Sequence, residues 1–333
     1  MKSKYQWETI YRGITAGDRV QLGRGLSLIE SKKEADKVEA GRLIDACLQN
    51  TSGKSIRVGI TGSPGSGKSS TIECIGMAAI ERGYKVAVLA IDPSSSLTGG
   101  SILGDKTRMP QLSASKKAFI RPSAAGSTLG GVASATREAI ALCEAAGYDL
   151  IIIETVGVGQ SETAVYHMTD LFVFLVLPGA GDELQGIKRG IVEMADLVVI
   201  NKADEERTPL AEQSKKDYSN ALHLFREKES GWQVKVLTHS IFDPKKTEAI
   251  LNEMEDFNRF VSEKSFKTSK RQEQQLNWFE ELLKTSIIDA VLSSRKGVEA
   301  PFDPVKKEVA KGILSPRSAV LKVMERLKGE LNL

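Results

Sequence analysis

The sequence contains few of the features that mark secreted, membrane or zinc-binding proteins. It has three cysteines and three histidines in 333 residues, and no Cys or His pair has the short spacing typical of zinc sites. The odd, widely separated set Cys47, Cys74 and Cys143 predicts reduced thiols in a cytosol-like compartment. The longest apolar run, Leu171 to Leu177, has the length of a buried strand and not of a membrane span. The first eight residues contain no apolar signal core.

The chain also carries little net charge. Lys and Arg number 46 and Asp and Glu number 43, a balance of +3, which gives no reason to expect nucleic acid or a membrane as partner. Apolar residues make up 41% of the chain and charged residues 27%, as in a soluble globular protein with an ample core. We therefore expect a cytoplasmic protein with one large domain or two ordinary ones.

One stretch, from Gly62 to Ser69, reads G-x-x-x-x-G-K-S and matches the phosphate-binding loop pattern. A β-branched run precedes it and a helical apolar spacing follows it, so strand, loop and helix stand in the required order. The glycines allow successive backbone N–H groups to face a phosphate, and the helix start adds unpaired N–H groups. Lys68 is expected to reach the β- and γ-phosphates as a catalytic residue, and the Ser69 hydroxyl to bind Mg²⁺. The predicted phosphate-contacting residues are Gly62, Ser63, Pro64, Gly65, Ser66, Gly67, Lys68, Ser69 and Ser70.

Near-continuous runs of Val, Ile and Leu recur between residues 55 and 240. Such runs suit strands that are covered on both faces, so we predict an α/β fold with a mainly parallel sheet between helices. Ligands of such sheets lie at the carboxyl ends of the strands. The predicted strands are Ile56–Thr61, Val86–Ile91, Ala118–Ile120, Leu150–Ile153, Leu171–Leu177, Leu197–Ile200 and Val234–Leu237.

A tetrapeptide N-K-A-D follows one of these strands, about 130 residues after the phosphate loop. Its Asp204 is placed to accept hydrogen bonds from the N1–H and the exocyclic amine of guanine. Adenine lacks both donors at these positions, so the motif predicts selection for guanine. Asn201 would bridge the base and the phosphate loop, and the stem of Lys202 would cover the base. A second base-contacting turn is predicted at Ser240 and Ile241, with the Ile241 N–H facing the guanine carbonyl.

Other polar residues at strand ends are candidates for binding Mg²⁺ and the γ-phosphate. Glu154 and Gly157 occupy the place of an Asp-x-x-Gly switch, in which Glu154 would hold Mg²⁺ through water and act in catalysis. The Gly157 N–H would bind the γ-phosphate. Asp92 and Asp105 are further Mg²⁺-side carboxylates, and a turn-capping Asp is the alternative interpretation of each. Lys188 is a catalytic candidate for stabilising the transferred phosphoryl group, and a surface helix lysine is the alternative.

Helical regions flank the nucleotide-binding part. We interpret residues 1–52 as an N-terminal extension of two amphipathic helices, 53–262 as the phosphate-loop domain and 263–333 as a C-terminal helical arm. Residues 264–275 are polar and basic, and we expect them to be solvated. A stripe of period 3.6 follows and needs a partner, either the final helix of the chain (315–327) or a second subunit. The stripe consists of Leu276, Phe279, Leu282, Leu283, Ile287, Ile288, Val291 and Leu292.

With these motifs assembled, the sequence closely resembles the GTPases associated with adenosylcobalamin-dependent methylmalonyl-CoA mutase, the MeaB/ArgK type. The resemblance is dense over residues 56–204, and its most specific parts are 104–109 and 154–162. It implies a sheet like that of the signal-recognition and metal-insertion (SIMIBI-like) GTPases, with GTP or GDP and Mg²⁺ as cofactors. It also implies a homodimer formed partly through the 263–333 arm. The implied role is to gate adenosylcobalamin delivery to methylmalonyl-CoA mutase, or a related acyl-CoA mutase, and to protect that enzyme.

Three other functions remain open from the sequence. A small-molecule (arginine) kinase of a transport system would need an acceptor pocket with a base near the γ-phosphate, and we identify none. A metal-insertion GTPase would need soft ligands, which the separated cysteines do not offer. A protein-targeting GTPase would need a methionine-rich groove, whereas this chain has seven scattered methionines.

Overall fold

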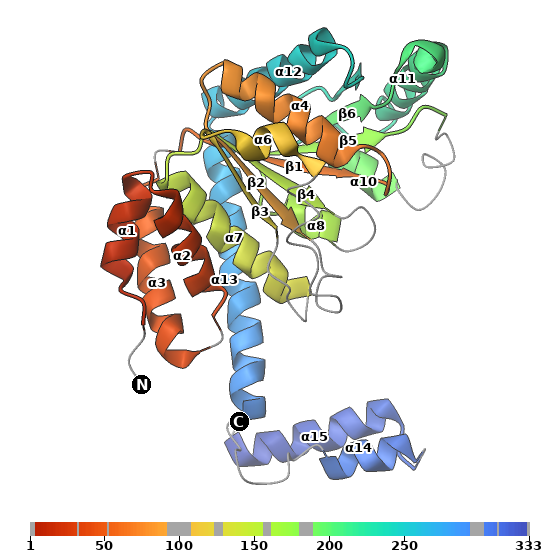
Figure 1. Ribbon diagram of the computed structural model, residues 1–333. Helices are drawn as coiled ribbons and strands as arrows, with labels where there is room; N and C mark the ends of the chain where they lie inside the picture. Colours follow the sequence, from red (N-terminus) through yellow and green to blue (C-terminus); the bar gives the residue numbers. More distant parts are fainter. Residues whose placement is uncertain are drawn as a thin grey trace. The chain divides into compact units, whose positions relative to one another are not determined.

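A seven-stranded sheet with only parallel pairings forms the centre of the molecule (Figure 1). The strand order is β3-β2-β4-β1-β5-β6-β7. The computed structural model describes residues 4–31, 33–51, 53–91, 108–122, 129–155, 161–179, 189–293, 303–311 and 313–331. The strands are β1 (Ile56–Gly62), β2 (Val86–Ile91), β3 (Ala118–Pro122), β4 (Leu150–Thr155), β5 (Leu171–Val176), β6 (Leu197–Ile200) and β7 (Lys235–Thr238). The predicted α/β fold is confirmed, and each strand lies within two residues of its predicted bounds.

Helices cover both faces of the sheet, which is why most residues of its strands are apolar (Figure 1). One layer contains α4 (Lys68–Glu81), α6 (Pro110–Ala114) and α12 (Pro244–Glu263). The opposite layer contains α7 (Leu129–Ala145), α8 (Ser161–Tyr166), α10 (Arg189–Met194) and α11 (Thr208–Leu222), the last preceded by the short 3-10 helix η2 (Glu205–Arg207). In β5, Leu171, Val173 and Leu175 pack into the first layer, whereas Phe174 and Val176 pack into the second. All six β5 residues are therefore buried.

The N-terminal region forms three helices where the sequence pattern predicted two. These are α1 (Trp7–Thr15), α2 (Arg19–Ile29) and α3 (Glu34–Gln49), which pack on one another and on α7. The break between α1 and α2 has a local cause, because the Asp18 carboxylate caps α2 by accepting hydrogen bonds from the N–H groups of Val20 and Gln21. These helices and the sheet belong to one compact unit, Met1–Gln274.

A second compact unit, Gln275–Leu333, contains the rest of α13 (Phe266–Ser293), with α14 (Asp303–Ala310) and α15 (Pro316–Leu331) packed on each other. Apolar side chains on its part of α13 are exposed: Leu276, Phe279, Leu282, Leu283 and Ile287. Across the described residues, no helix combines the length and the apolar character that crossing a bilayer requires.

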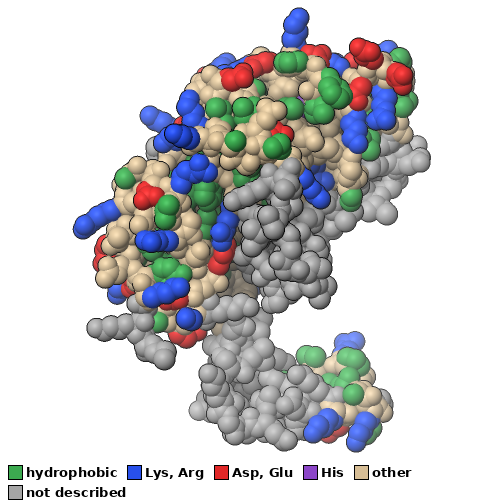
Figure 2. All heavy atoms as spheres, in the orientation of Figure 1, with side chains coloured by type: hydrophobic (Ala, Val, Ile, Leu, Met, Phe, Trp, Pro, Cys, Tyr) green, Lys and Arg blue, Asp and Glu red, His purple; other side chains and the backbone are tan. Residues whose placement is uncertain are grey.

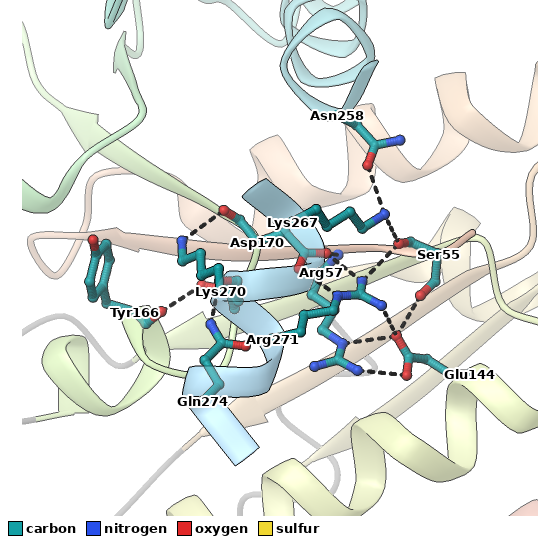
Figure 3. Close-up of polar contacts among 11 residues, drawn as sticks. Ser55, Arg57, Glu144, Tyr166, Asp170, Asn258, Lys267, Lys270, Arg271 and Gln274 are labelled. Atoms are coloured by element: carbon teal, nitrogen blue, oxygen red, sulfur yellow. Dashed lines mark hydrogen bonds and ion pairs between the residues drawn. The ribbon is translucent and has the colours of Figure 1, made fainter. Parts of the chain in front are cut away.

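The first turns of α13 enter a buried polar network at the amino ends of the strands (Figure 3). The Arg271 guanidinium contacts the carboxylates of Asp170 at 2.5 Å and Glu144 at 3.3 Å. The Lys267 ammonium donates to the carbonyl oxygen of Ser55 at 2.7 Å. The prediction that residues 264–275 are solvated is therefore wrong for Lys267 and Arg271, which meet carboxylates and carbonyls at the sheet edge, whereas most other residues of the segment are exposed. We call this set the α13 network: Ser55, Arg57, Glu144, Asp170, Lys267 and Arg271.

Charged side chains of both signs are interspersed over the face drawn in Figure 2. Lysine and arginine side chains lie close to aspartate and glutamate side chains over both the upper helices and the N-terminal helices. The drawing agrees with the small net charge of +3.

Candidate nucleotide site

The phosphate-binding loop joins the end of β1 to the start of α4, where the sequence predicted it. The Lys68 side chain is only 8% exposed, and its ammonium donates to the carbonyl oxygens of Gly62 at 2.8 Å and Ser63 at 3.1 Å. The Ser66 hydroxyl is buried and has no hydrogen-bond partner within the described residues. A buried polar group without a partner is costly, so this hydroxyl is suited to bind a ligand oxygen such as that of a phosphate.

Two loop positions have no room for a side chain. Gly67, immediately before α4, has a φ of +89°, and a Cβ there would lie 2.6 Å from Nδ2 of Asn201. A Cβ on Gly62 would lie 2.5 Å from the carbonyl oxygen of Leu175 on β5. Glycine is needed at Gly67 for its left-handed backbone, and at both positions because neighbouring atoms approach closely.

The predicted Mg²⁺ side of the site lies at the carboxyl end of β4. The Ser69 hydroxyl donates to Oε1 of Glu154 at 2.9 Å, and Glu154 is buried. Hydroxyl and carboxylate oxygens are the hard ligands that Mg²⁺ prefers, so the two residues fit this ion. The other residues predicted here, Asp92, Asp105, Gly157 and Lys188, lie outside the described residues. Their roles stay predictions.

The predicted base site lies beside the loop, after β6 and β7. Nδ2 of Asn201 donates to the carbonyl oxygen of Ser66 at 2.6 Å. The Ser240 hydroxyl donates to Oδ1 of Asp204 at 2.6 Å. Asp204 and Ser240 line one pocket of about 700 Å³, together with Phe242, which is 80% exposed. The structure thus brings the two predicted base-contacting turns together.

Two more predicted residues lie in these two turns. Lys202 has a φ of +56°, an uncommon backbone conformation for a residue with a side chain. Ile241 is 46% exposed, next to Ser240 in the second turn. Strand ends that are far apart in the chain therefore present the phosphate-binding loop, a hydroxyl–carboxylate pair and the pocket at the predicted base-contacting turns along one edge of the sheet.

Comparison with known proteins agrees with this arrangement. A family model described as "Methylmalonyl Co-A mutase-associated GTPase MeaB" matches residues 22–296. The chain belongs to the MeaB family. A "Putative GTPase" of Caulobacter vibrioides is 47% identical to this MeaB-family GTPase over 283 residues, which are 85% of this chain and 86% of the relative.

Two further similarities extend over almost the whole MeaB-family chain. The "Methylmalonic aciduria type A homolog, mitochondrial" of Mus musculus is 41% identical over 331 residues, 96% of this chain and 79% of the relative. The solved structure titled "Crystal structure of LAO/AO transport system kinase" is 32% identical, with a TM-score of 0.75, and covers 98% of this chain and 99% of its own. The resemblance inferred from the motifs is confirmed, and the protein is a GTPase that binds guanine nucleotide.

One residue of this MeaB-family GTPase, His239, was assigned no role of its own from the sequence. His239 is fully buried, and its ring contacts Asn201 through Nδ1 at 2.7 Å and Thr247 through Nε2 at 3.1 Å. Burial, reinforced by the nearby charge of Lys246, lowers the pKa of His239 to about 4. Its position immediately before Ser240 was the only signal in the sequence.

Proposed function

We propose that this MeaB-family GTPase is a switch that gates adenosylcobalamin delivery to methylmalonyl-CoA mutase, or a related acyl-CoA mutase, and protects that enzyme from inactivation. The family description names the mutase, and the mouse relative is named after methylmalonic aciduria. The structural observation that carries the proposal is the hydrogen bond from Ser69 to Glu154. It joins the phosphate loop to the strand that leads into the predicted switch at Gly157.

Each end of the nucleotide would be bound by a different part of the site. Lys68 would exchange its bonds to the carbonyls of Gly62 and Ser63 for the β- and γ-phosphates, a move within reach of one flexible side chain. Asp204 would accept from the two guanine donors, with Ser240 holding its carboxylate. Ser69 and Glu154 would hold Mg²⁺, which neutralises phosphate charge when bound.

The switch itself would depend on the γ-phosphate. When hydrolysis removes that phosphate, the bond from the Gly157 N–H is lost and the following segment is released. Val158 stands where some GTPases carry a water-positioning glutamine, so we expect slow hydrolysis by the protein alone. Binding of the mutase would then supply the missing water-positioning group, and Lys188 would respond to that binding. The mutase would also distinguish the GTP state from the GDP state.

We propose further that the protein is a homodimer. Leu276, Phe279 and Ile287 on α13 are 65%, 60% and 54% exposed. A run of exposed apolar side chains on one helix is typical of a protein–protein interface. A second copy of the same chain offers an equal stripe, and closed two-fold pairs are the commonest soluble assemblies.

The guanine site is tested by Asp204→Asn. This variant should weaken GTP binding by tenfold or more and favour a xanthine nucleotide, whose 2-carbonyl accepts from the new amide. Isothermal titration calorimetry with GTP, XTP and ATP measures the selectivity. Glu212→Gln removes the same charge at an exposed position of α11 outside this pocket and serves as the control, with GTP affinity retained. Unchanged GTP affinity in Asp204→Asn would remove this carboxylate from the base site.

The proposed partner is tested with the acyl-CoA mutase purified from the same organism. We expect the GTP-bound and GDP-bound proteins to differ in mutase affinity, and the mutase to accelerate GTP turnover. Transfer of adenosylcobalamin to apo-mutase should depend on GTP, and the mutase should survive more turnovers when the GTPase is present. Equal transfer in GTP, in GDP and without nucleotide would contradict the gating role.

The name of the solved relative supports a second candidate, a small-molecule kinase. A kinase transfers the γ-phosphoryl group to an acceptor, whereas a GTPase transfers it to water. Incubation with γ-³²P-GTP and arginine separates the two, because phosphoarginine appears only if arginine is the acceptor. We expect all of the label in inorganic phosphate.

A further inference from the structure

The ring of His239 lies between the guanine motif and α12. It is fully buried, and both of its nitrogens contact a polar side chain: Nδ1 contacts Oδ1 of Asn201 at 2.7 Å and Nε2 contacts Oγ1 of Thr247 at 3.1 Å. Thr247 belongs to α12 and is itself buried. The histidine backbone is also held, because its N–H donates to the carbonyl of Ile200 at 2.8 Å and its carbonyl accepts from the N–H of Ala203 at 2.9 Å.

These contacts determine which nitrogen carries the proton. Asn201 uses its NH₂ group to donate to the carbonyl oxygen of Ser66 at 2.6 Å, so its amide oxygen faces the ring. An amide oxygen only accepts hydrogen bonds, and therefore Nδ1 of His239 must be the donor. In the neutral ring Nε2 is then an acceptor, which the Thr247 hydroxyl satisfies. Burial, with Lys246 close by, lowers the pKa of His239 to about 4 and favours this neutral form.

We infer that His239 is a positioning residue for the nucleotide, whose Nδ1–H holds the Asn201 amide against the phosphate loop. The inference rests on the guanine site proposed above and adds to it a link between base recognition and the loop. The Asn201 amide has to be held in one orientation, because its NH₂ group donates to the carbonyl oxygen of Ser66 in the phosphate loop at 2.6 Å. A rotated amide would offer its oxygen to the Ser66 carbonyl, and two acceptors repel.

Two variants of similar polarity separate this role from simple packing. In His239→Asn the side-chain NH₂ lies near the position of Nδ1, so the bond to Asn201 is retained. In His239→Gln the NH₂ lies near the position of Nε2. The hydrogen bond to Asn201 is then lost, and the glutamine NH₂ takes the place of Nε2 in the contact with Thr247. We expect His239→Gln to weaken GTP and GDP about tenfold, because a buried acceptor loses its donor. His239→Asn should stay within about threefold of the native affinity, and His223→Gln, at an exposed histidine, should have no effect.

A double-mutant cycle shows whether the effect passes through Asn201. In an Asn201→Ala background, His239→Gln should cause no additional loss of GTP affinity, since the amide it positions is absent. Calorimetry measures the affinities, and thermal melting of each apo variant reports stability separately. Equal losses in His239→Asn and His239→Gln would overturn the inference. So would a full additional loss from His239→Gln in the Asn201→Ala background.

Failure of this inference can be told apart from failure of the guanine site. If Asp204→Asn loses GTP and His239→Gln does not, the guanine site holds and only the positioning role is wrong. If Asp204→Asn keeps GTP, the guanine site itself is wrong. Should His239→Gln not fold, Thr247→Val removes only the contact to Nε2. Because the Asn201 amide oxygen alone fixes the tautomer, GTP affinity should then stay within about threefold of native, and a tenfold loss would assign the effect to the Thr247 contact and overturn the inference.

Discussion

Replacing Arg271 by alanine tests how α13 is held to the sheet. The guanidinium contacts Asp170 at 2.5 Å and Glu144 at 3.3 Å, and these carboxylates are 2% and 7% exposed. Removing one member of a buried ion pair leaves the opposite charge desolvated and uncompensated. The free energy of unfolding should therefore fall by about 3–5 kcal/mol.

The assay is urea unfolding followed by circular dichroism, with Arg259→Ala as the matched control. Arg259 lies on α12 and pairs with Asp256, but its side chain is 66% exposed, so its loss should cost no more than about 1 kcal/mol. In the double variant Arg271→Leu with Asp170→Asn, no unpaired charge remains at this pair. This double variant should therefore recover part of the free energy of unfolding that Arg271→Ala loses.

The same contact predicts a dependence on pH. Burial acts to raise the pKa of Asp170, but the hydrogen bonds and charge of Arg271 outweigh burial and lower it to about 2. An unfolded Asp has a pKa of about 3.9, so the pairing stabilises the fold by about 2–3 kcal/mol above pH 4. That contribution is lost as the pH falls from about 4 through 2. The stability gap between wild type and Arg271→Ala should shrink over this range. The reasoning would be refuted if Arg271→Ala lost no more free energy of unfolding than Arg259→Ala does, or if its loss did not change with pH.

Three further predictions concern other parts of the molecule. Gly67→Ala should lower GTP affinity tenfold or more by calorimetry, because its Cβ would collide with Asn201, whereas Gly83→Ala, at φ +97° with open space, should cost only about 1 kcal/mol of stability. His239, with a folded pKa of about 4 and an unfolded value near 6.5, is neutral in both states above pH 6.5, and below that pH the unfolded state takes up the proton first. Stability should fall by up to about 3 kcal/mol from pH 6.5 to 4 in urea titrations, and less in His239→Asn. Leu283→Asp should convert the proposed dimer to a monomer in light scattering, and an unchanged mass would contradict a dimer contact at this stripe.

The sequence alone determined the sheet and the order of its motifs. The Leu171–Val176 strand is apolar at every residue, and a strand of that kind requires cover on both faces. The loop from Gly62 to Ser69 and the tetrapeptide ending at Asp204 depend on local backbone shape and on the chemistry of single side chains. Such features are encoded by consecutive residues, so they can be recognised without knowledge of distant contacts.

Only the tertiary structure revealed the partners of residues that act across long stretches of chain. His239 received no role of its own from the sequence, because the contact of its ring with Asn201, 38 positions away, depends on how the ends of two strands lie in the folded sheet. Residues 264–275 were expected to be solvated because they are basic, but Arg271 meets Asp170, 101 positions away, at the sheet edge. A charge or an imidazole is equally compatible with water and with a buried partner. The choice depends on which polar groups the folded sheet leaves unpaired nearby.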